Sequence, residues 1–295
     1  MEKPIEIAVI SGKGGTGKTV FASSLAKCAN SRVVADCDVD APNMHLLLNP
    51  VLRSQEPFFG GRIAVMDTDV CSRCGECFRT CRFDAVIEKD IPEGWQYSID
   101  TLSCEGCAAC TRACPEGALS MRELPPGAWY VSDSDCGPLI HANLAAGQRN
   151  ADELVRIVRR EARETAAREG LRTVIIDGPA GLGAPLITAI MGIALAVVVT
   201  EPTLSGIHDL RRLVELTGEL RIKTAVVINK CDLNPGVAVE IEEYLARAEV
   251  PLLGRIPYST EVNKATAGGK LLVEVADDPA AEEIKKIAAQ VLSVC

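Results

Sequence analysis

Residues 12–19 read GKGGTGKT, which matches the phosphate-loop pattern G-x-x-x-x-G-K-[ST]. Glycines in such a loop let backbone N–H groups converge on phosphate oxygens that side chains would otherwise block. Lys18 neutralises the outer phosphates, and the hydroxyl of Thr19 ligates magnesium. The pattern requires only one lysine, so it leaves the role of a second one, Lys13, open. The nucleotide-binding residues that this loop predicts are Gly12, Gly14, Gly15, Thr16, Gly17, Lys18 and Thr19.

Outside one cysteine-rich segment, short apolar runs alternate with helical patterns along the chain. Strands are expected at residues 5–11, 32–36, 172–178, 194–200, 223–230 and 251–257, and helices at 19–28, 150–168, 205–220, 236–248 and from 279 onward. Nearly continuous apolar strands that alternate with helices indicate parallel strands buried on both faces. The sequence therefore predicts an α/β P-loop fold, with a mostly parallel sheet covered by helices on both faces.

Eight of the thirteen cysteines lie between residues 71 and 114. CSRCGECFRTCRFDAV (71–86) and CEGCAACTRACPEGAL (104–119) share every cysteine position at an offset of 33 residues. Each copy has the spacing C-x2-C-x2-C-x3-C of bacterial ferredoxins, in which the fourth cysteine ligates the other cluster. This rule predicts two 4Fe–4S clusters, one held by Cys71, Cys74, Cys77 and Cys114 and the other by Cys104, Cys107, Cys110 and Cys81.

Zinc is the alternative occupant of these cysteines. It is disfavoured because tetrahedral zinc sites usually use paired C-x2-C knuckles. Proline follows the fourth cysteine in the ferredoxin pattern, and here Pro115 follows Cys114 whereas Arg82 follows Cys81. We expect this arginine to affect the potential of the nearby cluster rather than its assembly.

The cysteine-rich segment interrupts the α/β pattern and is interpreted as an insertion. The expected domains are a first part of the P-loop domain (1–62), a small α+β ferredoxin-like insert (63–122) and the second part of the P-loop domain (123–295). The formal net charge of −9 argues against nucleic-acid binding. The most apolar stretch, residues 186–200, is too short to span a membrane. The cysteines are concentrated in one block rather than spread through a short chain, as they are in secreted disulfide-rich proteins. This distribution favours a metal site in a reducing, cytoplasmic location.

GKGGTGKT resembles the deviant phosphate loop of the MinD/ParA/Mrp superfamily, which includes the nitrogenase iron protein. In that family the early lysine reaches across a nucleotide-sandwich dimer to the partner's phosphates. The resemblance implies that Lys13 acts in trans, in a nucleotide-dependent homodimer or in a heterodimer with a paralogous ATPase. Such a cation adds charge stabilisation at the transferring phosphoryl group.

The same resemblance assigns roles to acidic residues at two predicted strand ends. In DCDVDAPN (36–43) it implies that Asp38 orients the attacking water and that Asp36 lies on the magnesium side. Asp40, in the same run, aligns less securely and is equally explained as a solvated turn residue. DGPAGLG (177–183) resembles the second switch, with Asp177 beneath the magnesium ion. The expected catalytic residues are Lys13, Lys18, Asp38 and Asp177, and the expected magnesium residues are Thr19, Asp36 and Asp177.

The residues that bind the base leave two nucleotides open. INKCD (228–232) fits the N-K-x-D pattern with which GTPases bind guanine through Asn229 and Asp232. In MinD-like ATPases the Asn-Lys pair contacts adenine instead, together with a later loop that resembles the one around Pro257. We expect ATP, with GTP as the alternative.

The resemblance allows three functions. The first is an ATP-gated carrier of electrons to an unknown redox or metallocluster protein. The second is an ATPase that assembles or inserts iron–sulfur or other metal cofactors. The third is a MinD/ParA-like spatial organiser with a redox-sensing ferredoxin module. The C-terminus, AEEIKKIAAQVLSVC, lacks the aromatic and basic character of a membrane-binding tail. The stable, ferredoxin-type ligand set favours the first function.

Overall fold

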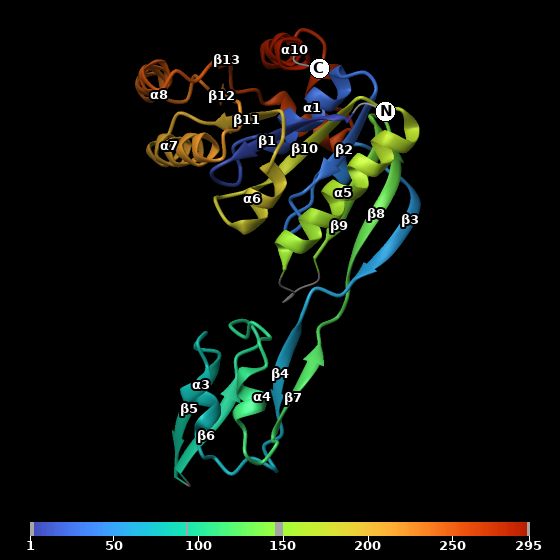
Figure 1. The fold of residues 1–295 in the computed structure, drawn as a ribbon. Helices are drawn as coiled ribbons and strands as arrows, with labels where there is room; N and C mark the ends of the chain where they lie inside the picture. Colours follow the sequence, from blue (N-terminus) through green and yellow to red (C-terminus); the bar gives the residue numbers. More distant parts are fainter. Residues whose placement is uncertain (1–2, 93, 145–149, 294–295) are drawn as a thin grey trace. The chain divides into compact units, whose positions relative to one another are not determined.

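The computed structural model describes residues 3–92, 94–144 and 150–293. The chain divides into two compact units (Figure 1). The first comprises residues 1–56, 129–143 and 152–295, and the second comprises residues 57–128 and 144–151. In the part of the chain that is described, no helix is both long enough and apolar enough to cross a bilayer.

A nine-stranded sheet forms the centre of the first unit. All neighbouring pairs from β13 to β9 are parallel. The strands, in sheet order, are β13 (Leu252–Ile256), β12 (Thr224–Asn229), β11 (Leu195–Thr200), β1 (Ile5–Ser11), β10 (Thr173–Ala180), β2 (Arg32–Asp36), β9 (Gly137–Asn143), β8 (Gly127–Ser134) and β3 (Val51–Phe58).

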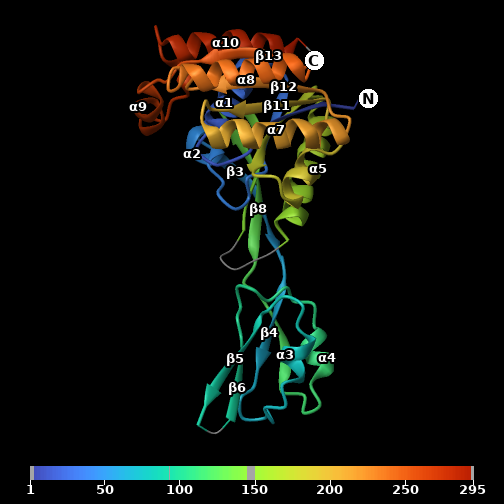
Figure 2. The ribbon, with the colours of Figure 1, turned by 90° about the vertical axis from the view of Figure 1, so that its left-hand side faces the viewer.

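Helices cover both faces of this sheet. α1 and α10 lie on one face and α5, α6 and α7 on the other, as Figure 2 shows for α10 and α7. The predicted fold class is therefore confirmed. The helices are α1 (Lys18–Cys28), α2 (Met44–Leu47), α5 (Ala151–Glu169), α6 (Ala184–Ile190), α7 (Leu204–Glu219), α8 (Pro235–Arg247), α9 (Glu261–Ala267) and α10 (Pro279–Leu292), with a 3-10 turn at Leu272–Glu274.

The strand β1 illustrates why the apolar runs are continuous. Ile7 and Val9 pack into the cluster that contains Phe21 of α1 and Ile284 of α10. Alternate residues of a strand point to opposite faces, and residues 8 and 10 of β1 are equally inaccessible to solvent. Both faces of the strand are thus buried, which is the reason that an alternating pattern is absent.

The second unit contains two antiparallel strand pairs. β4 (Arg62–Met66) pairs with β7 (Leu119–Glu123), and β5 (Val86–Ile91) pairs with β6 (Gly94–Ile99). The short helices α3 (Glu76–Thr80) and α4 (Ala109–Ala113) each lie between a strand of one pair and a strand of the other in sequence.

Equivalent contacts recur in the two halves of this unit at the 33-residue offset. The backbone N–H of Asp67 donates to the carbonyl of Ala118, and that of Asp100 donates to the carbonyl of Ala85, both at 2.8 Å. The small core combines Ile63, Val86, Tyr97 and Leu119 with Cys77, Cys104 and Cys110.

Candidate functional site

The phosphate loop connects β1 to α1, so its backbone N–H groups lie at the N-terminus of a helix. Gly17 precedes the first turn with φ 90°, and a Cβ atom there would lie 2.2 Å from Nδ2 of Asn229. Only glycine fits that position. The side-chain amide of Asn229 also donates to the carbonyl of Thr16 at 2.7 Å, so it braces the loop from the opposite strand end.

Lys18 and Thr19 converge on one buried carboxylate. Lys18 Nζ lies 2.8 Å from Oδ1 of Asp177 and 3.3 Å from Oδ2 of Asp38, and the Thr19 hydroxyl donates to Oδ2 of Asp177 at 2.7 Å. Burial opposes the charge on Lys18, but the carboxylates of Asp177 and Asp38 outweigh it and raise its pKa. For Asp177, burial raises the pKa of the carboxyl group, and the charge of Lys18 partly offsets this increase.

Asp36 fixes the chain that follows β2. It is completely buried, and its carboxylate accepts hydrogen bonds from the backbone N–H groups of Asp38 and Met44, each at 3.1 Å. Burial, followed by the nearby charge of Asp177, raises the pKa of Asp36 to about 8. These contacts hold Asp38 where its carboxylate reaches Lys18. Asp40, in contrast, is exposed.

The side chain of Lys13 contacts residues that follow β11. Its Nζ lies 2.6 Å from Oε1 of Glu201, 3.0 Å from the Ser205 hydroxyl and 3.3 Å from the Thr203 hydroxyl. Glu201 also pairs with Lys230 at 3.0 Å. Burial opposes ionisation of Glu201, but the hydrogen bonds from both lysines lower its pKa.

Glu201 was not identified from the sequence. It follows β11 directly, at the carboxyl edge of the parallel sheet where such folds bind ligands. An acidic residue directly after a predicted parallel strand was therefore the sequence signal that could have identified Glu201 as a site residue.

The residues expected to bind the nucleotide base, at what we call the base end of the site, are Asn229 and Asp232. Both make contacts within the protein. The Asn229 amide is held by the phosphate loop, and Lys230 Nζ donates to the carbonyl of Gly15 at 2.9 Å. Oδ1 of Asp232 accepts the backbone N–H of Tyr258 at 2.7 Å. The carboxylate that would bind guanine is thus used to fix the loop of residues 256–259, which favours adenine.

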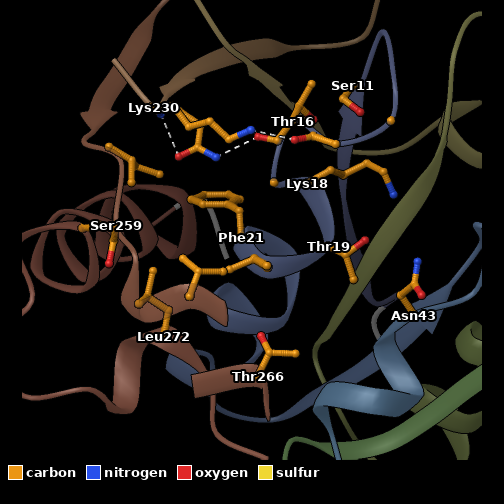
Figure 3. A pocket seen from close by; sticks show the side chains of 18 of the residues that line it. Ser11, Thr16, Lys18, Thr19, Phe21, Asn43, Lys230, Ser259, Thr266 and Leu272 are labelled. Carbon is orange, nitrogen blue, oxygen red and sulfur yellow. Dashed lines mark hydrogen bonds between the residues drawn. The ribbon is translucent and has the colours of Figure 1, made fainter. Parts of the chain in front are cut away.

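One pocket of about 680 Å³ joins the phosphate loop to the base end (Figure 3). Its size lies within the range of small-molecule sites. Phe21, Val262 and Leu272 form an apolar wall that sequence reasoning missed, because their spacing resembles that of ordinary core residues. The predicted residues that line it are Lys13, Gly14, Gly15, Thr16, Gly17, Lys18, Thr19, Asp38, Asn229 and Pro257; Gly12, Asp36, Asp177 and Asp232 lie outside its lining.

The cysteines of the second unit occupy two similar loops. α3 follows Gly75 at φ 75° and α4 follows Ala108 at φ 58°, so both helices begin from a left-handed residue in the middle of the cysteine repeat. A small, mainly apolar pocket is lined together by Cys81, Cys104, Cys107 and Cys110. In the described ranges no three His, Cys, Asp or Glu side chains are arranged to hold a single metal ion.

A phosphate loop between β1 and α1, with carboxylates after β2 and within β10, defines a P-loop nucleotide-binding protein. The family model for the CobQ/CobB/MinD/ParA nucleotide binding domain matches residues 7–273. The chain belongs to this family and is a P-loop ATPase of the MinD/ParA type.

Two curated relatives span nearly the whole chain. The uncharacterized protein MJ0578 of Methanocaldococcus jannaschii is 31% identical over 291 residues, which cover 96% of this chain and 95% of the relative. The match therefore extends into the cysteine-rich segment. The uncharacterized ATP-binding protein MJ0547 of the same organism is 26% identical over 294 residues, covering 98% and 88%.

Solved structures share the fold at lower sequence identity. The cell division ATPase MinD of Pyrococcus furiosus has a TM-score of 0.59 and 19% identity and covers 99% of both chains. MinD of Pyrococcus horikoshii, solved with Mg-ADP, has a TM-score of 0.58 and 18% identity and covers 98% of this chain and 96% of that one.

Proposed function

We propose that this protein is an ATP-gated electron carrier, in which ATP binding and hydrolysis at the first unit control electron transfer through two 4Fe–4S clusters in the second. The electrons pass to or from an unidentified redox or metallocluster protein. Because thiolate ligands persist in a reducing compartment, the proposal places the protein in the cytoplasm.

The observation that carries the proposal is the grouping of four cysteines from both repeats. Cys81 comes from the first repeat, yet it lines one pocket with Cys104, Cys107 and Cys110 of the second. Two-cluster ferredoxins require this exchange of the fourth ligand. The donor set fits the cofactor, because sulfur ligands in an apolar surrounding are what iron–sulfur clusters use. The second cluster would be held by Cys71, Cys74, Cys77 and Cys114.

At the nucleotide site, the residues present fit a magnesium ion bound beside the phosphates. The hydroxyl oxygen of Thr19 and Oδ2 of Asp177 already lie 2.7 Å apart, and Asp36 is completely buried. These three residues would hold the ion, which supplies positive charge to the outer phosphates. When nucleotide binds, Lys18 would contact phosphate oxygens instead of Asp177 and Asp38. Asp38 would then be free to orient the attacking water.

Gating requires a second chain. We assign Lys13 to the phosphates of a partner, either an identical chain or a paralogous one, because Lys18 and the glycine N–H groups already serve the phosphates of their own chain. Closure of such a dimer would be coupled to nucleotide binding, and bistable switch segments of this kind bias protein conformation.

A second candidate function is favoured by the comparisons alone. One solved neighbour is described as a cell division ATPase, which fits the MinD/ParA-like organiser.

An assembly ATPase for metal cofactors is distinguished from an electron carrier by what happens to the clusters. An assembly factor would transfer them to an acceptor, whereas an electron carrier would keep them through repeated reduction.

The test is the iron content of protein purified without oxygen. We expect about eight irons per chain, and about four in Cys81→Ser, because only one cluster loses a ligand. Cys28→Ser, in the first unit, is the matched control and should retain about eight irons. Zinc in place of iron, or an unchanged iron content in Cys81→Ser, would overturn the cluster assignment.

A further inference from the structure

The internal repeat shows which residues besides the cysteines are kept in both cluster loops. Between residues 71–86 and 104–119, only two other positions carry the same residue. One is Ala85 and Ala118, whose carbonyls join the two halves. The other is Arg79 and Arg112, and neither position belongs to the C-x2-C-x2-C-x3-C ligand pattern.

Both arginines make the same contact. Nη2 of Arg79 donates to the carbonyl of Cys74 at 2.9 Å, and Nη2 of Arg112 donates to the carbonyl of Cys107 at 3.4 Å. Cys74 and Cys107 are the two exposed cysteines of the eight in the insert. Each guanidinium therefore anchors the part of its cysteine loop that faces solvent.

We propose that Arg79 and Arg112 are positioning residues that also set the reduction potentials of the two clusters; this rests on the proposed function. The potential of an iron–sulfur cluster depends on nearby charge and on solvent exposure. A guanidinium stays protonated at all working pH values and favours the more negative, reduced cluster. Each arginine acts on the cluster whose exposed ligand it anchors.

The two arginines differ in their counter-charge. Arg79 also pairs with Glu76, one turn away, at 2.7 Å. The position equivalent to Glu76 in the second repeat is Ala109, which carries no charge. Glu76 thus partly neutralises the charge of Arg79, whereas among the described residues no ion pair with a carboxylate is found for Arg112. Removing Arg112 should therefore change its cluster more than removing Arg79 changes the other.

The experiment is a potentiometric titration of the holoprotein, followed by absorption and electron paramagnetic resonance. We expect Arg112→Gln to lower the ratio of reduced to oxidised cluster about threefold at fixed potential, or ~28 mV for a one-electron couple. Arg79→Gln should give a smaller shift in the same direction, and Glu76→Gln a shift in the opposite direction. Lys89→Gln, on β5, removes the same charge elsewhere in the unit and should leave both potentials unchanged.

Arg112→Lys separates the effect of charge from loss of structure. It should restore the potential towards that of the wild type, whereas a purely structural role would not be rescued by a shorter cation. Full iron content with unchanged potentials in Arg79→Gln and Arg112→Gln would overturn this inference and leave the proposed function standing. Wild-type protein without iron–sulfur absorption would instead show that the proposed function itself is wrong.

Discussion

The side chain of Lys13 shows what sequence can and cannot establish at the scale of one residue. The motif identifies Lys13 as additional to phosphate binding, but not where it rests without nucleotide. Its contacts, Glu201, Thr203 and Ser205, lie some 190 positions along the chain. No local pattern links these residues to the phosphate loop, because the parallel sheet brings together strand ends that are distant in sequence.

Glu201 should compete with the phosphates for Lys13. Replacing Glu201 by Gln removes the charged partner and leaves Lys13 with neutral groups. A charged hydrogen bond contributes about 1 kcal/mol at a partly exposed site. We therefore expect ATP-dependent association of the variant at roughly two- to fivefold lower protein concentration than that of the wild type. The measurement is ATP turnover as a function of protein concentration. Ser205→Ala, which removes only a neutral contact, should shift the curve less. A Glu201→Gln curve that coincides with wild type would contradict the competition.

At the scale of the elements, the buried strands and their helices were predictable, whereas the far edge of the sheet was not. Six strands coincide with the apolar runs of the sequence: β1, β2, β10, β11, β12 and β13. β3 reads VLRSQEPF, and only Phe58 in it is buried, so its residues carry no pattern of one-sided burial. β8 and β9 were missed because they read GAWYVSDS and GPLIHAN, with small and polar residues among the apolar ones.

These missed strands hold a stack of rings that should make stability depend on pH. His141 of β9 lies between Tyr130 of β8 and His45 of α2, with ring centroids 4.8 and 5.9 Å away. Burial, and then the charge of His45, lowers the pKa of His141 to about 4. The folded state thus prefers the neutral ring, and this contribution is present above pH ~6.5 and is lost as the pH falls towards 4.

Replacing His141 by Phe keeps a ring in the stack but removes the titration. Between pH 7 and pH 5 we expect wild type to lose about 1 kcal/mol more unfolding free energy than His141→Phe, after allowance for screening at a partly exposed ring. Urea denaturation at several pH values measures this difference. Parallel pH curves for the two proteins would mean that His141 titrates normally in the folded state.

The helix α5 is attached to the central sheet by a buried ion pair. Arg159 donates to both carboxylate oxygens of Glu6 on β1, at 2.8 and 2.9 Å, and to the carbonyl of Thr188 at 2.9 Å. Arg159→Met leaves the buried Glu6 carboxylate with only the longer contact to Arg163, at 3.8 Å, and should cost about 3–5 kcal/mol of unfolding free energy. Adding Glu6→Leu should recover most of this loss, because the buried carboxylate is then gone.

Arg156 provides the control on the same helix. It pairs with Glu153 in solvent, so Arg156→Met should change the unfolding free energy by less than about 1 kcal/mol. If Arg159→Met cost no more than this control, the buried pair would contribute little. Denaturant titration of the wild type and the three variants decides between these results.

At the scale of the whole molecule, the proposal depends on whether one chain contains a complete site. Lys18, Thr19, Asp38 and Asp177 are already in contact within one chain, and the pocket for the nucleotide is formed by that chain alone. Lys13 instead contacts Glu201, Thr203 and Ser205. If Lys13 serves a partner, hydrolysis must depend on protein concentration, while nucleotide binding need not.

Mixing an impaired variant with an inactive one tests this arrangement. Lys13→Ala should weaken ATP-dependent dimerisation and turnover but retain nucleotide binding, whereas Lys18→Ala should abolish turnover because the charge on the outer phosphates is lost. In a mixed dimer, the first chain supplies an intact Lys18 site and the second supplies Lys13, which makes charge-assisted bonds only once that chain arrives. We therefore expect the mixture to recover part of the wild-type turnover. Mixed dimers that form, as detected with two different affinity tags, but remain inactive would mean that Lys13 acts within its own chain, and ATP gating through a partner would lose its physical basis.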